Sequence, residues 1–166
     1  HDAILEPCKK LNSKGFQVDY LPVNKFGMID ISDLDNTLSK KTSLVSVMFG
    51  NNEVGTIQPI SEIAKACHEK KVVFHTDAVQ AVGKIPIDVK KLGIDLLSIS
   101  SHKLHGPKGI GALYIRDGVK IDPIILGGGQ EFRLRSGTEN VASIVGFGQA
   151  CEIAQNHLIE NMSSIK

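Results

Sequence analysis

The chain of 166 residues has few cysteines, no long apolar run and no excess charge of either sign. Its three cysteines, Cys8, Cys67 and Cys151, are too few and too widely spaced for a disulfide framework. None of them belongs to a CxxC motif or to a His/Cys cluster with metal-ligand spacing. We therefore expect free thiols and no metal site.

The balanced charge argues against binding to nucleic acid or to an anionic membrane, and the short apolar runs argue against a membrane-spanning protein. The 19 basic and 18 acidic residues are interspersed, which argues against a nucleic acid or an anionic membrane as partner. No apolar run approaches the roughly 18 to 20 residues that span a bilayer, and the opening HDAILEPCKK is not a signal sequence. With 42% hydrophobic and 22% charged residues, the sequence is typical of one globular domain that we expect to be soluble and intracellular.

Short apolar runs rich in β-branched residues alternate with longer amphipathic or charged segments. This alternation indicates repeated βα units and predicts an α/β fold with a mainly parallel sheet and flanking helices. The predicted strands are 16–21, 44–48, 72–76 and 96–100, and the segments between them are 32–41, 61–71 and 88–93. Strands 44–48, 72–76 and 96–100 are apolar nearly throughout, so we expect them to be central in the sheet.

The last third of the chain departs from the βα alternation. Residues 109–116 follow the tight turn HGPKG, which is too short for a crossover helix, so this strand is predicted to run antiparallel to its predecessor. Residues 140–162 are predicted to form one long helix, although Gly146 and Gly148 each cost it about 1 kcal/mol.

Polar residues follow three of the predicted strands directly. Ligands of open α/β sheets bind at the carboxyl ends of parallel strands, so these residues are expected to share one site. They are Asn51 and Asn52 after the first of these strands, Asp77 and Gln80 after the second, and Ser100, Ser101, His102 and Lys103 after the third.

Each of these residues also has an ordinary structural explanation. Asn52 could satisfy a turn, Asp77 could cap a helix and Gln80 could be a plain helix residue. Lys103 is harder to explain in this way, because partial removal from water at a sheet edge would make its amine a better nucleophile. The structural explanations would have to hold at three strand ends together, which favours a shared ligand. His75, inside its strand, is interpreted as a satisfied core residue.

A lysine, a carboxylate, amides and hydroxyls are the groups that hold pyridoxal phosphate (PLP). The lysine forms a Schiff base with the cofactor, and the carboxylate keeps the pyridine nitrogen protonated so that the ring withdraws electrons. Hydroxyls, backbone N–H groups and a histidine can bind the phosphate.

Four segments resemble those of the cysteine desulfurases of the nitrogen-fixation and iron-sulfur-assembly branch. These enzymes belong to the class V aminotransferases of PLP fold type I. The segments are NNEVGTIQPI, VVFHTDAVQAVGK, SISSHKLHGPKGIGALYIR and GGGQEFRLRSGTEN, in this order. The resemblance covers essentially the whole chain and implies that it is the central part of one PLP-binding large domain.

The resemblance also implies a role for individual residues. Lys103 would form the Schiff base with PLP, Asp77 would pair with the pyridine nitrogen and Gln80 would bind the ring hydroxyl. Asn52 would lie near that hydroxyl and the substrate carboxylate, and His1 would stack on the ring. Three residues would approach the phosphate: Ser100, Ser101 and His102. Thr138 would reach the phosphate of the neighbouring subunit, which implies a homodimer.

Two departures from the family pattern limit the implied activity. The family reads QERG or HERG where this chain has Gln130, Glu131, Phe132 and Arg133. We also expect the chain to lack the family's preceding segment and its following small domain, which carries the persulfide-forming cysteine; none of Cys8, Cys67 and Cys151 matches that cysteine.

In the family, PLP-dependent cleavage of L-cysteine yields alanine and passes sulfur to an enzyme cysteine, and then to an acceptor or iron-sulfur scaffold protein. The resemblance implies this function for the complete protein, in the cytoplasm or in the mitochondria of a eukaryote. The 166 residues alone are predicted to be inactive. Selenocysteine lyase, which shares these motifs, and a noncatalytic scaffold or dimerisation module remain as alternatives.

Overall fold

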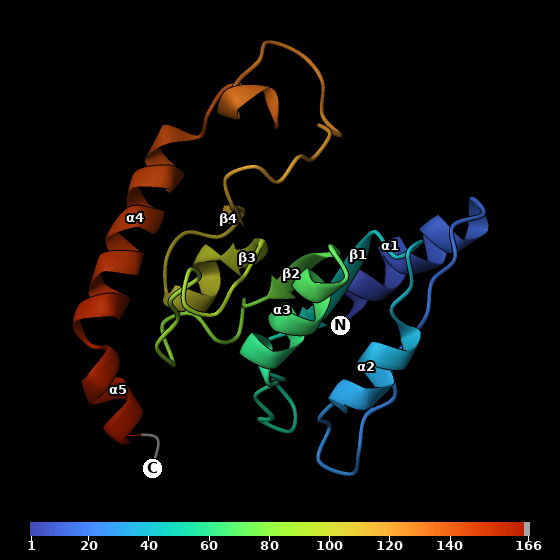
Figure 1. Ribbon diagram of the computed structural model, residues 1–166. Coiled ribbons are helices and arrows are strands. Elements are labelled where there is room, and N and C mark those ends of the chain that lie inside the picture. Colours follow the sequence, from blue (N-terminus) through green and yellow to red (C-terminus); the bar gives the residue numbers. More distant parts are fainter. Residues whose placement is uncertain (165–166) are drawn as a thin grey trace.

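The computed structural model describes residues 1–164 as a four-stranded sheet with helices on one face and beyond one edge (Figure 1). The strands are β1 (Leu44–Met48), β2 (Val73–Asp77), β3 (Leu96–Ser100) and β4 (Gly111–Ile115), in the spatial order β1-β2-β3-β4. The first three are parallel, and β4 runs antiparallel to β3. The α/β class, the mainly parallel sheet and the antiparallel last strand are therefore confirmed.

Seven helical segments accompany the sheet within the described residues. They are α1 (Asp2–Ser13), α2 (Ile31–Thr37), α3 (Ile60–Glu69), the 3₁₀ turns η1 (Ser101–Leu104) and η2 (Glu131–Arg133), α4 (Val141–Asn156) and α5 (Leu158–Ser164). Figure 1 shows α1 and α2 at one side of the molecule and α4 and α5 at the other. None of the helices in residues 1–164 has the length and apolar character needed to cross a membrane.

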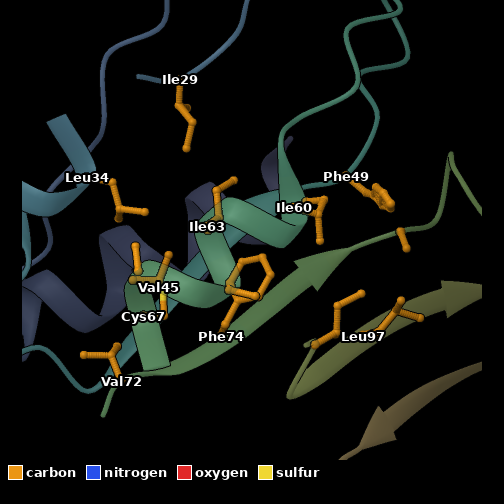
Figure 2. Packing of buried hydrophobic residues seen from close by; sticks show 14 of the residues in the cluster. Ile29, Leu34, Val45, Phe49, Ile60, Ile63, Cys67, Val72, Phe74 and Leu97 are labelled. Carbon is orange, nitrogen blue, oxygen red and sulfur yellow. The ribbon is translucent and has the colours of Figure 1, made fainter. Parts of the chain in front are cut away.

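The main core lies between α3 and one face of the sheet (Figure 2). Alternation along a strand points every second side chain to this face, which therefore receives Val45, Phe74 and Leu97. From α3, Ile63 and Cys67 pack against them, both fully buried. Fully burying side chains of this size contributes about 1.5–3 kcal/mol each, so this interface fixes α3 against the strands.

A second, smaller cluster holds α4 against the turn that follows β3. Leu104, Phe147 and Ala150 form its buried part. Gly146 is required here, because a Cβ at this position would lie 2.8 Å from Cγ of Pro107. The glycine that weakens the helix thus permits its close approach to the turn.

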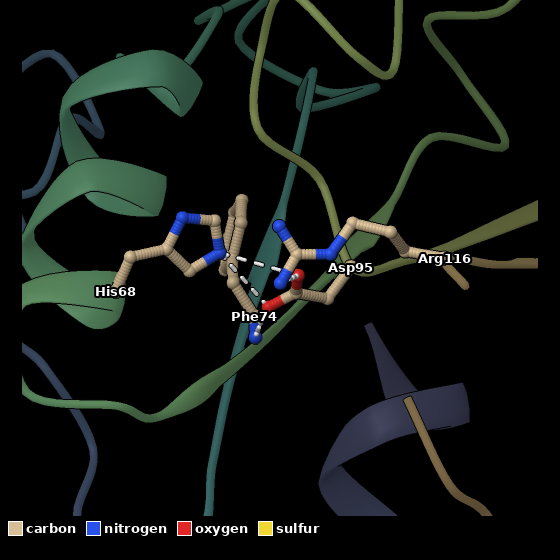
Figure 3. A network of polar contacts seen from close by, with 4 residues as sticks. All are labelled: His68, Phe74, Asp95 and Arg116. Atoms are coloured by element: carbon tan, nitrogen blue, oxygen red, sulfur yellow. Dashed lines mark hydrogen bonds and ion pairs between the residues drawn. The ribbon is translucent and has the colours of Figure 1, made fainter. Parts of the chain in front are cut away.

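A buried carboxylate joins the amino ends of β2 and β3 to their neighbours (Figure 3). Asp95 accepts hydrogen bonds from the backbone N–H of Phe74 at 2.8 Å and from Nε2 of His68 at 3.1 Å. Its other oxygen pairs with Nη2 of Arg116 at 2.7 Å. Because its three partners come from α3, β2 and the end of β4, Asp95 connects these elements.

Four expectations about secondary structure were wrong. Residues 16–21 form no strand, because they have no partner strand among the described residues and leave Phe16 and Tyr20 about 60% exposed. As a result β1 is an edge strand of the described sheet rather than a central one. Residues 88–93 form one turn, capped by Asp88 and ended by Gly93 at φ 69°, because six residues are too few for a helix. The long helix is interrupted at His157, where ψ is 8° and where Asn and His are weak helix formers.

Candidate cofactor site

The carboxyl ends of β1, β2 and β3 lie side by side, and backbone hydrogen bonds continue beyond the strands. The N–H of Phe49 donates to the carbonyl of Asp77 at 2.8 Å, and the N–H of Ala78 donates to the carbonyl of Ser98 at 3.0 Å. The loops after the three strands therefore start next to one another. We call the residues that follow these strands, 49–52, 77–80 and 100–103, the carboxyl edge.

Asp77 is the last residue of β2 and is only 8% exposed. Its Oδ1 accepts a hydrogen bond from the backbone N–H of Val79 at 3.0 Å, which is a local turn contact rather than the helix cap considered above, because residues 79–84 form turns and not a helix. Within residues 1–164, Oδ2 has no hydrogen bond. A buried carboxylate with one oxygen unused is suited to receive a proton-bearing group of a ligand.

His75 lies two residues before Asp77 and contacts the neighbouring strands on both sides. Its Nδ1 is 2.7 Å from Oγ of Ser46 in β1, and its Nε2 is 2.9 Å from Oγ of Ser98 in β3. Burial lowers the pKa of His75 from its ordinary value of 6.5, although the nearby charge of Asp77 offsets part of this effect. His75 is thus a neutral, satisfied residue, as interpreted from the sequence.

The short 3₁₀ turn η1 follows β3 directly and carries Lys103. The lysine is half-buried and makes no hydrogen bond or ion pair within residues 1–164. At the start of the turn, Oγ of Ser100 and Nδ1 of exposed His102 are 2.7 Å apart. Ser101 is fully enclosed, and its hydroxyl has no partner among the described residues.

A groove of about 890 Å³ runs between η1 and α4 and includes Lys103 in its lining. Lys84, which also lines it, donates to Oε1 of Gln80 at 2.8 Å. The groove therefore connects the loop after β2 with the loop after β3. Sequence analysis did not find it, because the opposite wall is formed by α4 residues such as Gly146, Gln149 and Ile153, which carry no motif.

The remaining predicted residues lie in different environments. Asn52 is exposed in the turn after β1, where the neighbouring Asn51 accepts the N–H groups of Glu53 and Val54. His1 is exposed and caps α1 through a bond from Ala3 N–H to its Nδ1 at 3.1 Å. Thr138 is exposed in the loop before α4. The adjacent strand ends therefore bring Asp77, Gln80 and residues 100–103 to one edge, and Asn52 lies in the loop that starts beside them.

The loop before Thr138 has an unusual backbone. Glu131, Phe132 and Arg133 all have positive φ, between 49° and 67°, and Phe132 is 94% exposed. Left-handed backbone costs roughly 1–2 kcal/mol for each residue other than glycine. Arg133 occupies one of these positions, where the family pattern has glycine.

The donor set at the carboxyl edge fits PLP. Among the described residues 1–164, it contains a half-buried lysine whose amine has no partner, a buried carboxylate with an unused oxygen, and a hydroxyl paired with an exposed imidazole. The described residues offer no group of three or more His, Cys, Asp or Glu side chains that could hold a metal ion. These side chains are complementary to an organic phosphate cofactor that carries an aldehyde and a ring nitrogen.

The sheet with its carboxyl edge is the α/β architecture of aminotransferase-like proteins. The family model for aminotransferase class-V matches residues 1–166, and the chain belongs to this family.

Similar proteins of known name are cysteine desulfurases. The chain is 56% identical to cysteine desulfurase IscS of Methanosarcina thermophila over 97% of its length, and 54% identical to a mitochondrial cysteine desulfurase of Arthroderma benhamiae over 95%. It spans 40% and 32% of these relatives, respectively.

Solved structures give the same result. A NifS-like protein superposes with a TM-score of 0.93 at 50% identity, over 96% of this chain and 44% of that one. A structure described as SspA in complex with cysteine has a TM-score of 0.89 at 45% identity, over 92% of this chain and 44% of that one.

Proposed function

We propose that this chain is the central part of the PLP-binding large domain of a cysteine desulfurase. The observation that carries the proposal is the carboxyl edge, where Asp77 ends β2 and Lys103 lies in the turn after the adjacent parallel strand β3. Within residues 1–164 the lysine amine has no partner and one oxygen of the carboxylate is unused. The names of the relatives, the IscS of Methanosarcina thermophila and the mitochondrial enzyme of Arthroderma benhamiae, supply the reaction.

PLP, when bound, would supply an aldehyde that captures amines and a protonated ring that withdraws electrons from the α-carbon of an amino acid. Asp77 would hold the proton on the ring nitrogen by a charge-assisted hydrogen bond. Gln80 and Asn52 would orient the ring hydroxyl, and Ser100 and His102 would bind the phosphate. Ser101 is assigned to the phosphate by resemblance alone, because its hydroxyl is enclosed.

Lys103 would bind the cofactor through its amine and, once a substrate amine takes its place, would move a proton at the substrate α-carbon. The substrate is L-cysteine, by analogy with the relatives' names. Alanine and a persulfide on an enzyme cysteine would be the products, and an acceptor or iron-sulfur scaffold protein would take the sulfur.

The working unit would be a homodimer in which Thr138 reaches the phosphate bound by the neighbouring subunit, while His1 would stack on the cofactor ring. We place the protein in the cytoplasm, or in mitochondria if the source is eukaryotic, as the name of the Arthroderma benhamiae relative suggests.

The test uses borohydride reduction in the presence of PLP, followed by peptide mass mapping. We expect covalent label on Lys103 and none on Lys84, which lines the same groove and serves as the matched control. Lys103→Ala should abolish the label, and Lys84→Ala should preserve it. Label on Lys84 or on Lys108 in place of Lys103 would refute the assignment.

The reaction itself is tested by incubating the protein with PLP and L-cysteine and measuring alanine and sulfide. We expect no turnover from the 166 residues alone and turnover once the sequence is joined to a domain that carries a persulfide-forming cysteine. Turnover by the 166 residues with Cys8, Cys67 and Cys151 all replaced by serine would contradict this mechanism. Preference of the joined protein for selenocysteine over cysteine would favour selenocysteine lyase.

A further inference from the structure

A row of three hydrogen-bonded side chains crosses the sheet next to the carboxyl edge. Ser46 of β1, His75 of β2 and Ser98 of β3 are linked by contacts of 2.7 Å and 2.9 Å. We call these three residues the polar row. The imidazole in its centre is only 8% exposed.

The polar row lies on the same face of the sheet as Asp77. Side chains alternate along a strand, so His75 and Asp77, two residues apart, share one face. Phe74 and Thr76 point to the other face, where Phe74 belongs to the core under α3. Ser98 pairs directly with Asp77 in the register of β2 and β3. The row therefore borders the carboxylate on its own strand and on the next.

Fold stability alone does not explain these residue types. Polar side chains inside strands are costly to bury unless they are hydrogen-bonded, and apolar residues would serve the same position at lower cost. Both nitrogens of His75 instead meet hydroxyl groups, which can donate or accept, so a neutral ring is satisfied in either tautomer. The row is polar and carries no cation of its own.

The polar row suits the proposed role of Asp77. Its hydroxyl and imidazole groups satisfy one another, so none of them needs the Asp77 carboxylate as a partner. A lysine or arginine beside Asp77 would instead compete with a positively charged ring for the same carboxylate.

We propose that Ser46, His75 and Ser98 are positioning residues that join β1, β2 and β3 beside the buried Asp77 and so keep its carboxylate oriented for the ring nitrogen of PLP. This proposal rests on the proposed function. It assigns a task to a histidine and two serines that contact neither substrate nor cofactor in the scheme above.

The first experiment needs no cofactor. In labelled protein, NMR would follow the His75 ring nitrogens, the carboxyl carbon of Asp77 and the hydrogen exchange of the Val79 amide, which donates to Asp77. We expect a neutral His75 ring at neutral pH. Ser98→Ala removes the hydroxyl that meets Nε2 of His75 and should shift the Asp77 carboxyl resonance and speed Val79 exchange, because Ser98 lies opposite Asp77 and links β3 to β2.

Three further variants separate positioning from general stability. Ser98→Thr keeps the hydroxyl and should restore the wild-type signals. Ser46→Ala removes the hydroxyl at the other end of the row. It should have a smaller effect, because the strand register places Ser46 opposite His75, whereas it places Ser98 opposite Asp77. Thr76→Val is the matched control, because its hydroxyl lies on the opposite face and has no partner among the described residues.

The second experiment measures the dissociation constant of PLP for the same variants by absorbance. Ser98→Ala should weaken binding about tenfold, and Thr76→Val should not. A protonated His75, or wild-type NMR signals and wild-type PLP affinity in Ser98→Ala, would overturn the proposal. If Ser98→Ala fails to fold, the protonation state of His75 and the response to Ser46→Ala decide. Failure of the wild-type protein to bind PLP, even when it is joined to the rest of its domain, would refute the proposed function instead. The NMR result would still test the positioning role of the polar row.

Discussion

A buried aspartate lies at each end of strands β2 and β3, and the two aspartates differ in the number of hydrogen bonds that their carboxylates receive. At the amino ends, Asp95 is 1% exposed and receives hydrogen bonds from Phe74, His68 and Arg116. At the carboxyl ends, Asp77 is 8% exposed and receives one backbone hydrogen bond from Val79.

This difference distinguishes a structural carboxylate from the one that we propose to bind a ligand. Burying a charge is costly unless it is paired, and Asp95 meets that condition within its own chain. Asp77 meets it only in part, and Lys103, in the turn after the next strand, also has no partner within residues 1–164. Unsatisfied polar groups at one edge of a sheet support the ligand-binding role proposed above.

The largest expected effect is on catalysis, at the carboxyl end. Asp77→Asn in the complete enzyme should lower turnover of L-cysteine by about 2.7–4 kcal/mol of transition-state free energy, the cost of removing one preorganised electrostatic group. Because Oδ1 of the amide can still accept from Val79, the free energy of unfolding should change little. The measurements are steady-state kinetics and urea unfolding, and near wild-type turnover would contradict the role of Asp77.

The opposite result is expected at the amino end. Asp95→Ala should lower the free energy of unfolding by about 3 kcal/mol, because it leaves the Phe74 N–H without a partner and removes the ion pair with the half-exposed Arg116. PLP labelling of Lys103 under conditions where the variant is folded should remain. Urea unfolding provides the test, with Asp88→Ala as a control that removes an exposed carboxylate from a turn. Equal loss of stability in both variants would show that the Asp95 contacts contribute nothing special.

The sequence predicted the polar residues at the carboxyl ends of these strands but not the Asp95 contacts at their amino ends. Apolar runs bounded by turns located β1, β2 and β3 within one residue, and the parallel arrangement of their ends then placed Asp77 and Lys103 at one edge. Asp95, His68 and Arg116 are far apart in the sequence and form no motif, so only the folded chain brings them together. The polar row was missed for the same reason, although His75 itself was interpreted correctly.

Failures in secondary structure have a related cause. Residues 16–21 alternate like a strand, but a strand forms only where another offers its edge, which local sequence does not show. Residues 88–93 have helix start and stop signals that lie too close together for more than one turn. The roles of His1 and Thr138 came from the resemblance alone and stay predictions.

The smallest expected effect concerns Cys67, which packs in the core near the amino-end carboxylate. Burial, followed by the charges of Asp95 and Asp35, raises the pKa of Cys67 to about 12. At pH 8 only about one thiol in 10⁴ would then be ionised, and the thiolate is the species that reacts with alkylating reagents. Iodoacetamide should therefore label the partly exposed Cys8 and Cys151 well before Cys67 in the folded protein, and all three equally in urea.

In folded Asp95→Ala, Cys67 should react faster than in the wild type, because one of the charges that oppose its ionisation is gone. Mass mapping of the labelled peptides measures this, and rapid labelling of Cys67 in the native wild-type protein would mean that the core under α3 is open to solvent.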